Sequence, residues 1–431
     1  MSTLNREREF VLCTLGTQGD ISPFLAIGSA LAARGHSVTI LSNAHWRDQV
    51  EACGAGFAAI APRDPPRSGR DDFAFFRSNV VPSFHESFHH IEQRVARGNK
   101  VVVLFKAGML GAQCAAEKLG LRHIKVALQP SAIRSVQRPA WPLTRLAQGR
   151  WGALTRSTLI PLIYRTTELL GRYRRVTNAY RRVHGLRPVG LGETNRTEDL
   201  MVLLCPQWFA MPQSDWPANC RFAGFAFTPT GDLDAELRDF LATRGPPLVF
   251  TPGTGVTDTQ SFFRMAGEVC RALAAPGIFL SAGMHEQWLA ANILCRRYVD
   301  LGALLPRAQL LVHHGGIGTT AQALRAGIPQ IVMPKAFDQP DNAMRIAALR
   351  LGGVVLSHRV ADSAVVDLCR ATLADQVLRE RLVIAARDIR QRCAANEVAC
   401  MAEALALDDG VSQIAPRRRH SLATNVGERT A

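Results

Sequence analysis

The chain has 431 residues, of which 47% are hydrophobic and 20% charged, a composition ordinary for a globular protein of two or three domains. No apolar run approaches the roughly 18 to 20 residues of a membrane-spanning helix, and the ten cysteines form no CxxC pair. We therefore expect a soluble cytoplasmic protein with reduced thiols. Its formal net charge of +15 leaves an anionic partner open.

Short apolar runs rich in branched residues alternate with helical patterns along the chain. The first series of predicted strands comprises Phe10 to Leu15, Ser37 to Ser42, Val101 to Phe105, Ile124 to Leu128 and Met201 to Cys205. The second series comprises Leu248 to Thr251, Gly277 to Leu280, Leu310 to His313, Gln330 to Met333 and Gly353 to Leu356. Strands that alternate with helices indicate parallel sheets covered on both faces, so the sequence predicts an α/β protein with two doubly wound domains.

The boundary between the two series lies at 227–247, where proline, glycine and acidic residues interrupt the apolar rhythm. We expect this segment to be a linker between an N-terminal domain over 1–226 and a C-terminal domain that starts at residue 248. The stretch 412–431 is basic and has no apolar face to bury, so it is predicted to be a disordered tail.

The first candidate site follows the first predicted strand, in "TLGTQGDISPFLAIGSALAARGHSVTI" (Thr14 to Ile40). Ser22 suits a helix N-cap and Pro23 the first helical turn, which leaves Gly16 to Ile21 as a loop with Asp20 at the positive end of the helix. The glycine spacing is not the GxGxxG dinucleotide fingerprint, so a hydride-transfer enzyme is disfavoured. Asp20 is either a turn residue or a general base that faces a bound substrate.

A strongly basic segment runs from Arg134 to Arg187, with twelve arginines and a single acid, Glu168. Such a block either meets an anionic partner or forms solvated helix faces. The aromatic residues of the segment show no regular spacing, so a nucleic-acid partner is disfavoured.

The second candidate site is "LLVHHGGIGTT" (Leu310 to Thr320), in which a strand runs into two histidines and three glycines before a helix. Adjacent histidines on a strand point to opposite faces, and no further ligand lies at metal spacing, so a metal site is disfavoured. A Walker loop would need a lysine before the threonines. Free amides at a helix start form an anion site, so the motif predicts phosphate binding with one histidine facing the ligand. We expect that histidine to be His314 and His313 to be structural.

The flanks of this motif resemble a known family. The segment "YVDLGALLPRAQLLVHHGGIGTTAQALRAGIPQIVMPKAFDQPDNA" (Tyr298 to Ala343) resembles the donor signature of the family 1 nucleotide-sugar glycosyltransferases. It is most similar to bacterial rhamnosyltransferase B-chain proteins and to sterol or macrolide glucosyltransferases. The opening loop and "PQWFAMPQSDWPANCRFAGF" (Pro206 to Phe225) are similar to the same family, so the resemblance extends to about residue 405.

This resemblance implies a GT-B fold, in which two Rossmann-like domains face each other across a cleft. The N-terminal domain then binds the acceptor, the C-terminal domain over 248–380 binds the donor, and a helix over 381–405 returns to the N-terminal domain. Donor diphosphate binding falls on His314, Gly316, Gly318, Thr319 and Thr254, sugar binding on Asp338 and Gln339, and nucleoside binding on Tyr298 and Gln322.

Three departures from the family pattern matter. Tyr298 stands where many relatives carry Trp-x-Pro-Gln, which leaves the identity of the nucleotide base open. Tyr298 itself either stacks on the base or is a buried strand tyrosine. Gln322 replaces a ribose-binding Glu, so both UDP and dTDP donors fit. Asp20 replaces the catalytic His of plant relatives, and the region "LFKAGMLG" lacks the acid that orients that His.

The expected activity is an inverting, metal-independent transfer of a hexosyl or deoxyhexosyl group to a hydroxyl of a lipophilic acceptor, with Asp20 as base and no cofactor. A hydroxy-fatty-acyl acid, as in rhamnolipid synthesis, would match both the apolar runs and the arginines of 134–187. A sterol or polyketide acceptor is the alternative, if the arginines instead contact an anionic membrane surface. A non-catalytic nucleotide-sugar-binding subunit is the second alternative, and fold alone does not separate these.

Overall fold

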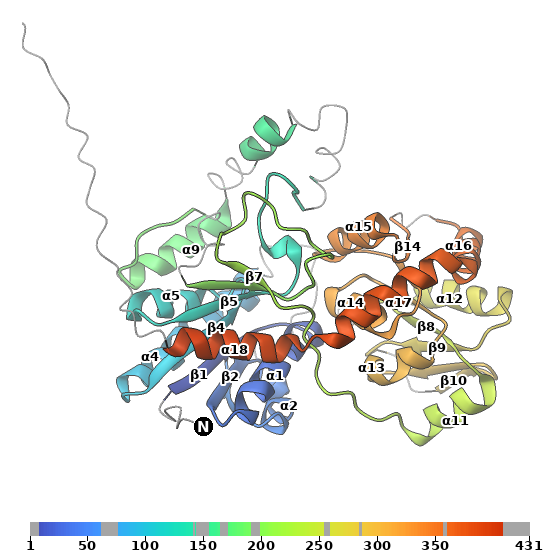
Figure 1. The fold of residues 1–431 in the computed structure, drawn as a ribbon, viewed down its shortest axis with the longest axis horizontal. Coiled ribbons are helices and arrows are strands. Elements are labelled where there is room, and N and C mark those ends of the chain that lie inside the picture. The colour runs from blue at the N-terminus through green and yellow to red at the C-terminus, as the bar shows by residue number, and fades with distance from the viewer. Residues whose placement is uncertain are drawn as a thin grey trace, which may run out of the picture.

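The computed structural model describes residues 8–61, 76–140, 143, 155–163, 171–190, 199–253, 259–283, 287–356 and 360–407. Within these residues the chain forms two α/β domains side by side, each built on a seven-stranded sheet (Figure 1). The predicted tail over 412–431 lies outside the described residues.

The N-terminal sheet has the strand order β3-β2-β1-β4-β5-β6-β7, and all its pairs are parallel. Its strands are β1 Arg8–Cys13, β2 Ser37–Ser42, β3 Gly56–Ala59, β4 Lys100–Lys106, β5 His123–Ala127, β6 Leu200–Leu203 and β7 Cys220–Phe222. The connecting helices are α1 Gln18–Ala33, η1 Ala44–Trp46, α2 Arg47–Ala52, η2 Phe76–Val80, α4 Pro82–Ala96, α5 Leu110–Leu119, η3 Pro130–Ala132, η4 Thr155–Leu159 and α9 Arg172–Val183.

Alternation along each strand divides the N-terminal core into two layers. Phe10 and Leu12 of β1 belong to the cluster that includes the buried residues of α1, whereas Val11 and Cys13 belong to the cluster of α4 and α5. Both faces of the sheet are therefore covered, which explains why its central strands are continuously apolar.

The C-terminal sheet has the order β10-β11-β9-β8-β12-β13-β14. Its strands are β8 Leu248–Thr251, β9 Gly277–Leu280, β10 Gln287–Ala290, β11 Ile293–Arg296, β12 Leu310–His313, β13 Gln330–Val332 and β14 Gly353–Val354. Only β10 is antiparallel to its neighbour among the described strands, because it turns back on β11 as an edge hairpin. The helices are α11 Ala235–Arg244, α12 Gln260–Ala272, α13 Leu301–Leu304, η5 Leu305–Arg307, α14 Ile317–Ala326, α15 Gln339–Leu349, α16 Asp362–Ala374, α17 Gln376–Gln391 and α18 Ala394–Leu407.

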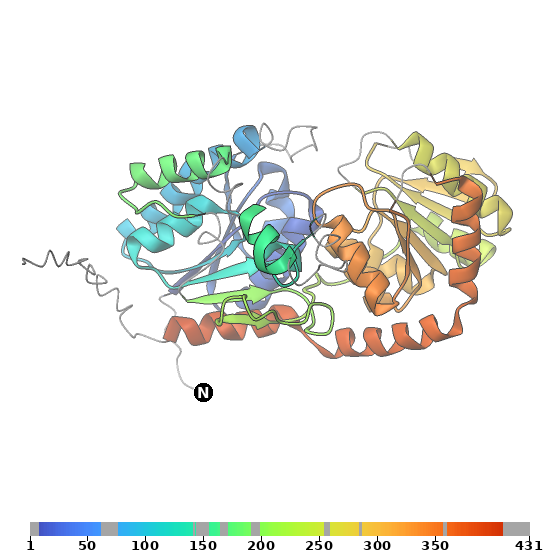
Figure 2. The same ribbon diagram turned by 90° about the horizontal axis from the view of Figure 1, so that it is seen from above.

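The two domains are joined by a shared apolar cluster and by the last two helices. Phe209 and Phe225 of the N-terminal domain pack in one cluster with Leu324 of α14 and Leu382 of α17. Helices α17 and α18 run along one side of the molecule, from the C-terminal domain across to the N-terminal one (Figure 2). There α18 packs against α1, and its small buried residues complete the core of the N-terminal domain.

Two predicted boundaries differ from the structure. The segment 227–247, expected to be a linker, contains α11, because Leu237 and Phe240 bury against Val249 and Ile278 of the C-terminal sheet. Charged residues surround Leu237 and Phe240 in the sequence, so the short apolar face of this helix was not recognised from the sequence pattern. The boundary at residue 380 falls inside α17, and the return to the N-terminal domain begins at Ala394 in α18.

The other differences are at the sheet edges. The strands β3, β7, β10 and β11 were not predicted, because they are short and three of them carry polar or small residues where a buried strand would be apolar. No helix among the described residues is both long enough and apolar enough to cross a lipid bilayer. All ten cysteines are unpaired.

Replacing Val398 by Ala tests whether α18 belongs to the N-terminal core. Val398 on α18 is fully buried, so we expect the substitution to lower the free energy of unfolding by about 2 kcal/mol, measured by urea denaturation. Val383→Ala on α17 is the matched control, since that side chain is 65% exposed and should cost little. Equal effects of the two substitutions would contradict this packing.

Candidate functional site

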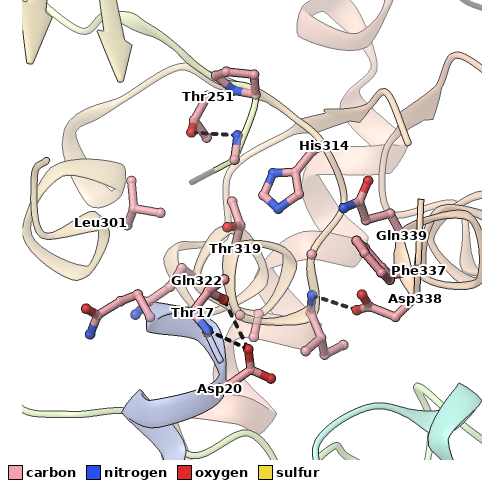
Figure 3. Close-up of a pocket in the computed structure, with 18 of the residues that line it drawn as sticks. Thr17, Asp20, Thr251, Leu301, His314, Thr319, Gln322, Phe337, Asp338 and Gln339 are labelled. Carbon is pink, nitrogen blue, oxygen red and sulfur yellow. Dashed lines mark hydrogen bonds between the residues drawn. The ribbon is translucent and has the colours of Figure 1, made fainter. Parts of the chain in front are cut away.

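A cleft of about 1080 Å³ lies between the two domains, and its walls are the loops at the carboxyl ends of both sheets. This is where ligands bind in open parallel sheets. The lining includes Asp20, Tyr298, His314, Gly316, Gly318, Thr319, Gln322, Asp338 and Gln339, which are nine of the ten predicted site residues. The tenth, Thr254, lies outside the described residues. Figure 3 shows Asp20 on α1 facing the start of α14.

Asp20 lies in the first turn of α1, which begins at Gln18 with Thr17 as its N-cap. The predicted N-cap at Ser22 and the predicted loop to Ile21 are therefore wrong. The capping residue three positions before Asp20 explains this, because the Asp20 carboxylate accepts a hydrogen bond from the Thr17 amide at 2.8 Å. Pro23 lies inside the helix, where it removes one backbone donor.

Three contacts fix the Asp20 carboxylate. Oδ2 accepts from the amide and the hydroxyl of Thr17, at 2.8 and 3.1 Å. Oδ1 accepts from Nζ of Lys106 at 2.6 Å, and that ammonium also donates to the Leu15 carbonyl at 2.7 Å. Gly16 has φ of +135°, and a Cβ there would lie 2.1 Å from Asp20 Oδ2, so only glycine allows this close approach.

The start of α14 forms the second wall of the cleft. Gly316 is the N-cap, so the amides of Gly318 and Thr319 lie in the first turn, where no carbonyl of the helix can accept from them. They and the helix dipole suit an anion. Gly19 of α1 meets this helix start, since a Cβ on Gly318 would lie 3.6 Å from the Gly19 Cα.

The two histidines occupy different surroundings. His313 is fully buried, its Nε2 donates to Gln330 Oε1 at 2.9 Å, and its Nδ1 accepts from the Gly315 amide at 3.1 Å. His314 lines the cleft. Its ring packs against Gly253 and Gly316, where a Cβ would approach it to 2.9 and 2.6 Å.

Burial, together with the nearby charge of Lys335, lowers the pKa of His314 to about 4, although the Thr251 backbone partly offsets this. The imidazole is therefore neutral near pH 7. Its Nδ1 is buried and makes no hydrogen bond of good geometry to any residue that the structure describes. A neutral ring of this kind can donate one N–H to a bound oxyanion.

Asp338 and Gln339 lie at the start of α15, beside His314 (Figure 3). Asp338 Oδ2 accepts from Asn342 Nδ2 at 2.7 Å and from the Ile317 amide at 3.2 Å. Burial raises the pKa of Asp338 to about 6, the charge of Asp20 adds to this, and the hydrogen bonds from Asn342 and Ile317 oppose it. Both carboxylates line the same cleft.

The oxygen of the Gln339 side-chain amide is held by the loop that precedes α15. Its Oε1 accepts from the amides of Lys335 and Ala336, at 2.9 and 3.1 Å, so Nε2 is the end that remains for a substrate. This contact holds Phe337 with φ of +58°, a conformation that costs a non-glycine residue about 1 to 3 kcal/mol. The Phe337 ring is 64% exposed and lines the cleft.

The far end of the cleft holds the predicted nucleoside residues. The Tyr298 ring is 65% exposed, so it is not a buried strand residue and its face is available to a base. Gln322 of α14 lines the same space, and its Oε1 is buried without a hydrogen-bond partner in the described part of the chain. A buried unsatisfied oxygen in a ligand cleft is suited to accept from a ligand hydroxyl.

Residue-by-residue reasoning from the sequence missed three residues of this cleft: Lys106, Phe337 and Gly16. Lys106 was noted only as lying where an acid was lacking. Its position at the end of β4, beside the loop that follows β1, was the available signal, because neighbouring parallel strands end together. Within the described residues, no group of three or more His, Cys, Asp or Glu side chains is placed to hold a metal ion.

Comparison with known proteins identifies the class. Residues 10–111 match the glycosyltransferase family 28 N-terminal domain, and residues 281–405 match the erythromycin biosynthesis protein CIII-like C-terminal domain. The O-mycaminosyltylonolide 6-deoxyallosyltransferase of Streptomyces fradiae is 30% identical over 366 residues, which are 78% of this chain and 82% of that protein. The chain thus belongs to the family 1 nucleotide-sugar glycosyltransferases and is an enzyme of this class.

Solved structures show the same fold. A glycosyltransferase of kitacinnamycin superposes with a TM-score of 0.70 at 20% identity, covering 92% of this chain and 99% of that one. The spinosyn rhamnosyltransferase solved with thymidine diphosphate superposes with a TM-score of 0.64 at 20% identity, covering 91% of this chain and 99% of that one. The predicted GT-B fold is confirmed.

The raised pKa of Asp338 predicts a pH dependence of donor binding. We propose that Asp338 holds sugar hydroxyls and that its ionised carboxylate accepts their hydrogen bonds more strongly than the protonated acid does. The Kd of a nucleotide-sugar should then rise by up to about tenfold as pH falls from 7 to 5, through the value of about 6. Isothermal titration calorimetry checks this. Asp338→Asn should bind more weakly at pH 7 and lose this dependence, and a variant that kept it would refute the assignment.

Proposed function

We propose that the protein transfers a deoxyhexosyl group from a dTDP- or UDP-sugar to a hydroxyl of a lipophilic natural product, with inversion at the anomeric carbon. The observation that carries the proposal is the position of the Asp20 carboxylate opposite the start of α14 and His314, within one cleft. The space between them receives the sugar, with the acceptor on the side of Asp20 and the diphosphate on the side of α14.

The proposed reaction is one displacement. The acceptor oxygen attacks the anomeric carbon while its proton passes to Asp20, and the bond from that carbon to the diphosphate oxygen breaks with its electron pair. His314 and the amides of Gly318 and Thr319 stabilise the charge that grows on the diphosphate, which lowers the barrier because these donors are already in place. Asp338 and Nε2 of Gln339 hold the sugar hydroxyls. Protein groups thus stabilise the charge on the departing diphosphate, and we propose that no metal ion is required.

The preference for a deoxy sugar rests on Phe337 and on the relatives. An exposed aromatic ring beside the sugar-binding residues offers an apolar surface, which suits a methyl group where a hexose carries a hydroxymethyl. The relative from Streptomyces fradiae is named for 6-deoxyallosyl transfer and the spinosyn enzyme for rhamnosyl transfer. The spinosyn enzyme was solved with thymidine diphosphate, and Gln322 fits deoxyribose as well as ribose.

The preference for a neutral lipophilic acceptor rests on the lining of the cleft. On the acceptor side, Leu15, Met109, Leu128 and Phe225 give it an apolar wall. None of the described arginines of 134–187 lines this cleft, so the described part of that segment offers no partner for an acceptor carboxylate. A macrolide-like acceptor, as in the name of the 30% identical relative, therefore suits the site better than a hydroxy-fatty-acyl acid.

The deciding experiment is a donor and acceptor panel. The purified protein is offered dTDP-rhamnose, UDP-glucose and UDP-GlcNAc with macrolide aglycones and hydroxy-fatty acids, with and without EDTA, and products are read by mass. Transfer to a macrolide that survives EDTA is expected. Saturable nucleotide binding without any product would favour a non-catalytic binding subunit, and loss of activity in EDTA would overturn metal independence.

Two substitutions should separate the proposed roles. Asp20→Asn should lower kcat by about 10² to 10⁴-fold with little change in donor Kd, because it removes only the base. His314→Ala should instead weaken nucleotide-sugar and nucleoside diphosphate binding together. Near-normal turnover of Asp20→Asn would defeat its assignment as the base.

Phe337→Ala tests the preference for a deoxy sugar. A methyl packed on this ring contributes about 0.8 kcal/mol, so the KM for a 6-deoxyhexosyl donor should rise about fourfold more than that for the matching hexosyl donor. Parallel kinetics with dTDP-6-deoxyglucose and dTDP-glucose, which differ only at C6, provide the comparison. Equal changes would remove Phe337 from donor selection.

A further inference from the structure

Lys106 is the last residue of β4, and β4 pairs with β1 in the centre of the N-terminal sheet. Its Nζ lies 2.6 Å from Asp20 Oδ1 and 2.7 Å from the Leu15 carbonyl oxygen. Both Lys106 and Asp20 line the cleft, and their side chains are 23% and 26% exposed. An ion pair at this depth is only partly screened by solvent.

We propose that Lys106 is the positioning residue of the catalytic base, holding the Asp20 carboxylate aimed into the cleft. The proposal rests on the proposed function, in which Asp20 accepts the proton of the acceptor hydroxyl. It gives a role to the position where the sequence lacks the acid expected beside a histidine base. A carboxylate base has no tautomer for an acid to select, and its useful neighbour is a cation.

The contacts also assign the oxygen that receives the proton. A carboxylate offers about two acceptor positions on each oxygen. Oδ2 already accepts two hydrogen bonds from Thr17, whereas Oδ1 accepts one from Lys106. The remaining position on Oδ1 therefore takes the acceptor proton, and Lys106 and Thr17 together prevent the carboxylate from rotating.

Charged groups act on Asp20 from two other elements. Lys106 of β4 contacts its carboxylate, and Asp338, at the start of α15, has a pKa that the charge of Asp20 raises further. Thr17 and Gly16, which directly precede α1, are uncharged. The ammonium of Lys106 therefore attracts the Asp20 carboxylate and holds it in place, whereas Asp338 is a second acid.

The test is the split between kcat and the donor Kd, which separates the orientation of Asp20 from donor binding. In Lys106→Met, kcat at saturating substrates should fall roughly 10-fold to 100-fold from lost orientation, while the donor Kd stays near the wild-type value. Lys106→Arg should restore most of kcat. Lys100→Met, at the other end of the same strand, is the matched control and should leave both quantities unchanged.

Each result decides the proposal. A Lys106→Met variant whose kcat matches the wild type, or whose kcat and donor Kd worsen together, overturns it and leaves Lys106 a merely structural residue. If Lys106→Met does not fold, as judged by thermal unfolding and nucleotide affinity, Lys106→Gln replaces it, since glutamine keeps a donor without the charge. An active Asp20→Asn variant or an inactive wild type would instead show failure of the proposed function.

Discussion

The contact between the starts of α1 and α14 is the constraint on which the cleft depends. Gly19 and Gly318 have no side chains, so two helix N-termini from different domains approach closely. Both helix dipoles then point their positive ends at one space. In the proposed reaction, that space receives an anionic diphosphate on one side and borders the carboxylate of Asp20 on the other, and the two positive helix ends stabilise both negative charges.

Residues that are far apart in the sequence hold this contact in place. The apolar cluster of Phe209, Phe225, Leu324 and Leu382 joins the domains behind the cleft. Trp208 adds a hydrogen bond from its Nε1 to Asp388 Oδ2 at 2.8 Å, which ties α17 to the N-terminal domain. The two carboxylates of the cleft have different surroundings. Asp20 contacts an ammonium, whereas Asp338 is buried with amide donors and has a raised pKa.

The sequence predicted the sheets well, and nine of the ten residues that it singled out line one cleft, for identifiable reasons. All ten predicted strands are present within one or two residues of their expected bounds, because central parallel strands are buried on both faces and need continuous apolar runs. The helix start after His314 was visible because glycines and threonines follow a strand. The start of α1 was misplaced because Ser22 and Pro23 gave a stronger local signal than the Thr17 and Asp20 capping pair.

Other features lay beyond the reach of a single sequence. The partnership of Asp20 with Lys106 joins residues 86 positions apart, and only the pairing of β1 with β4 brings them together. The strained backbone of Phe337 depends on Gln339 turning back on its own loop. Neither feature follows from residue type and spacing alone, since each needs the tertiary register.

The packing of α18 against α1 makes the N-terminal domain discontinuous along the chain. Residues 394–407 supply part of its core, so that core cannot be complete until nearly all described residues have left the ribosome. An exchange of domains between relatives would have the same requirement. A chimaera that takes its N-terminal domain from this protein must also take α18, or it will place a foreign helix against α1, the helix that carries Asp20.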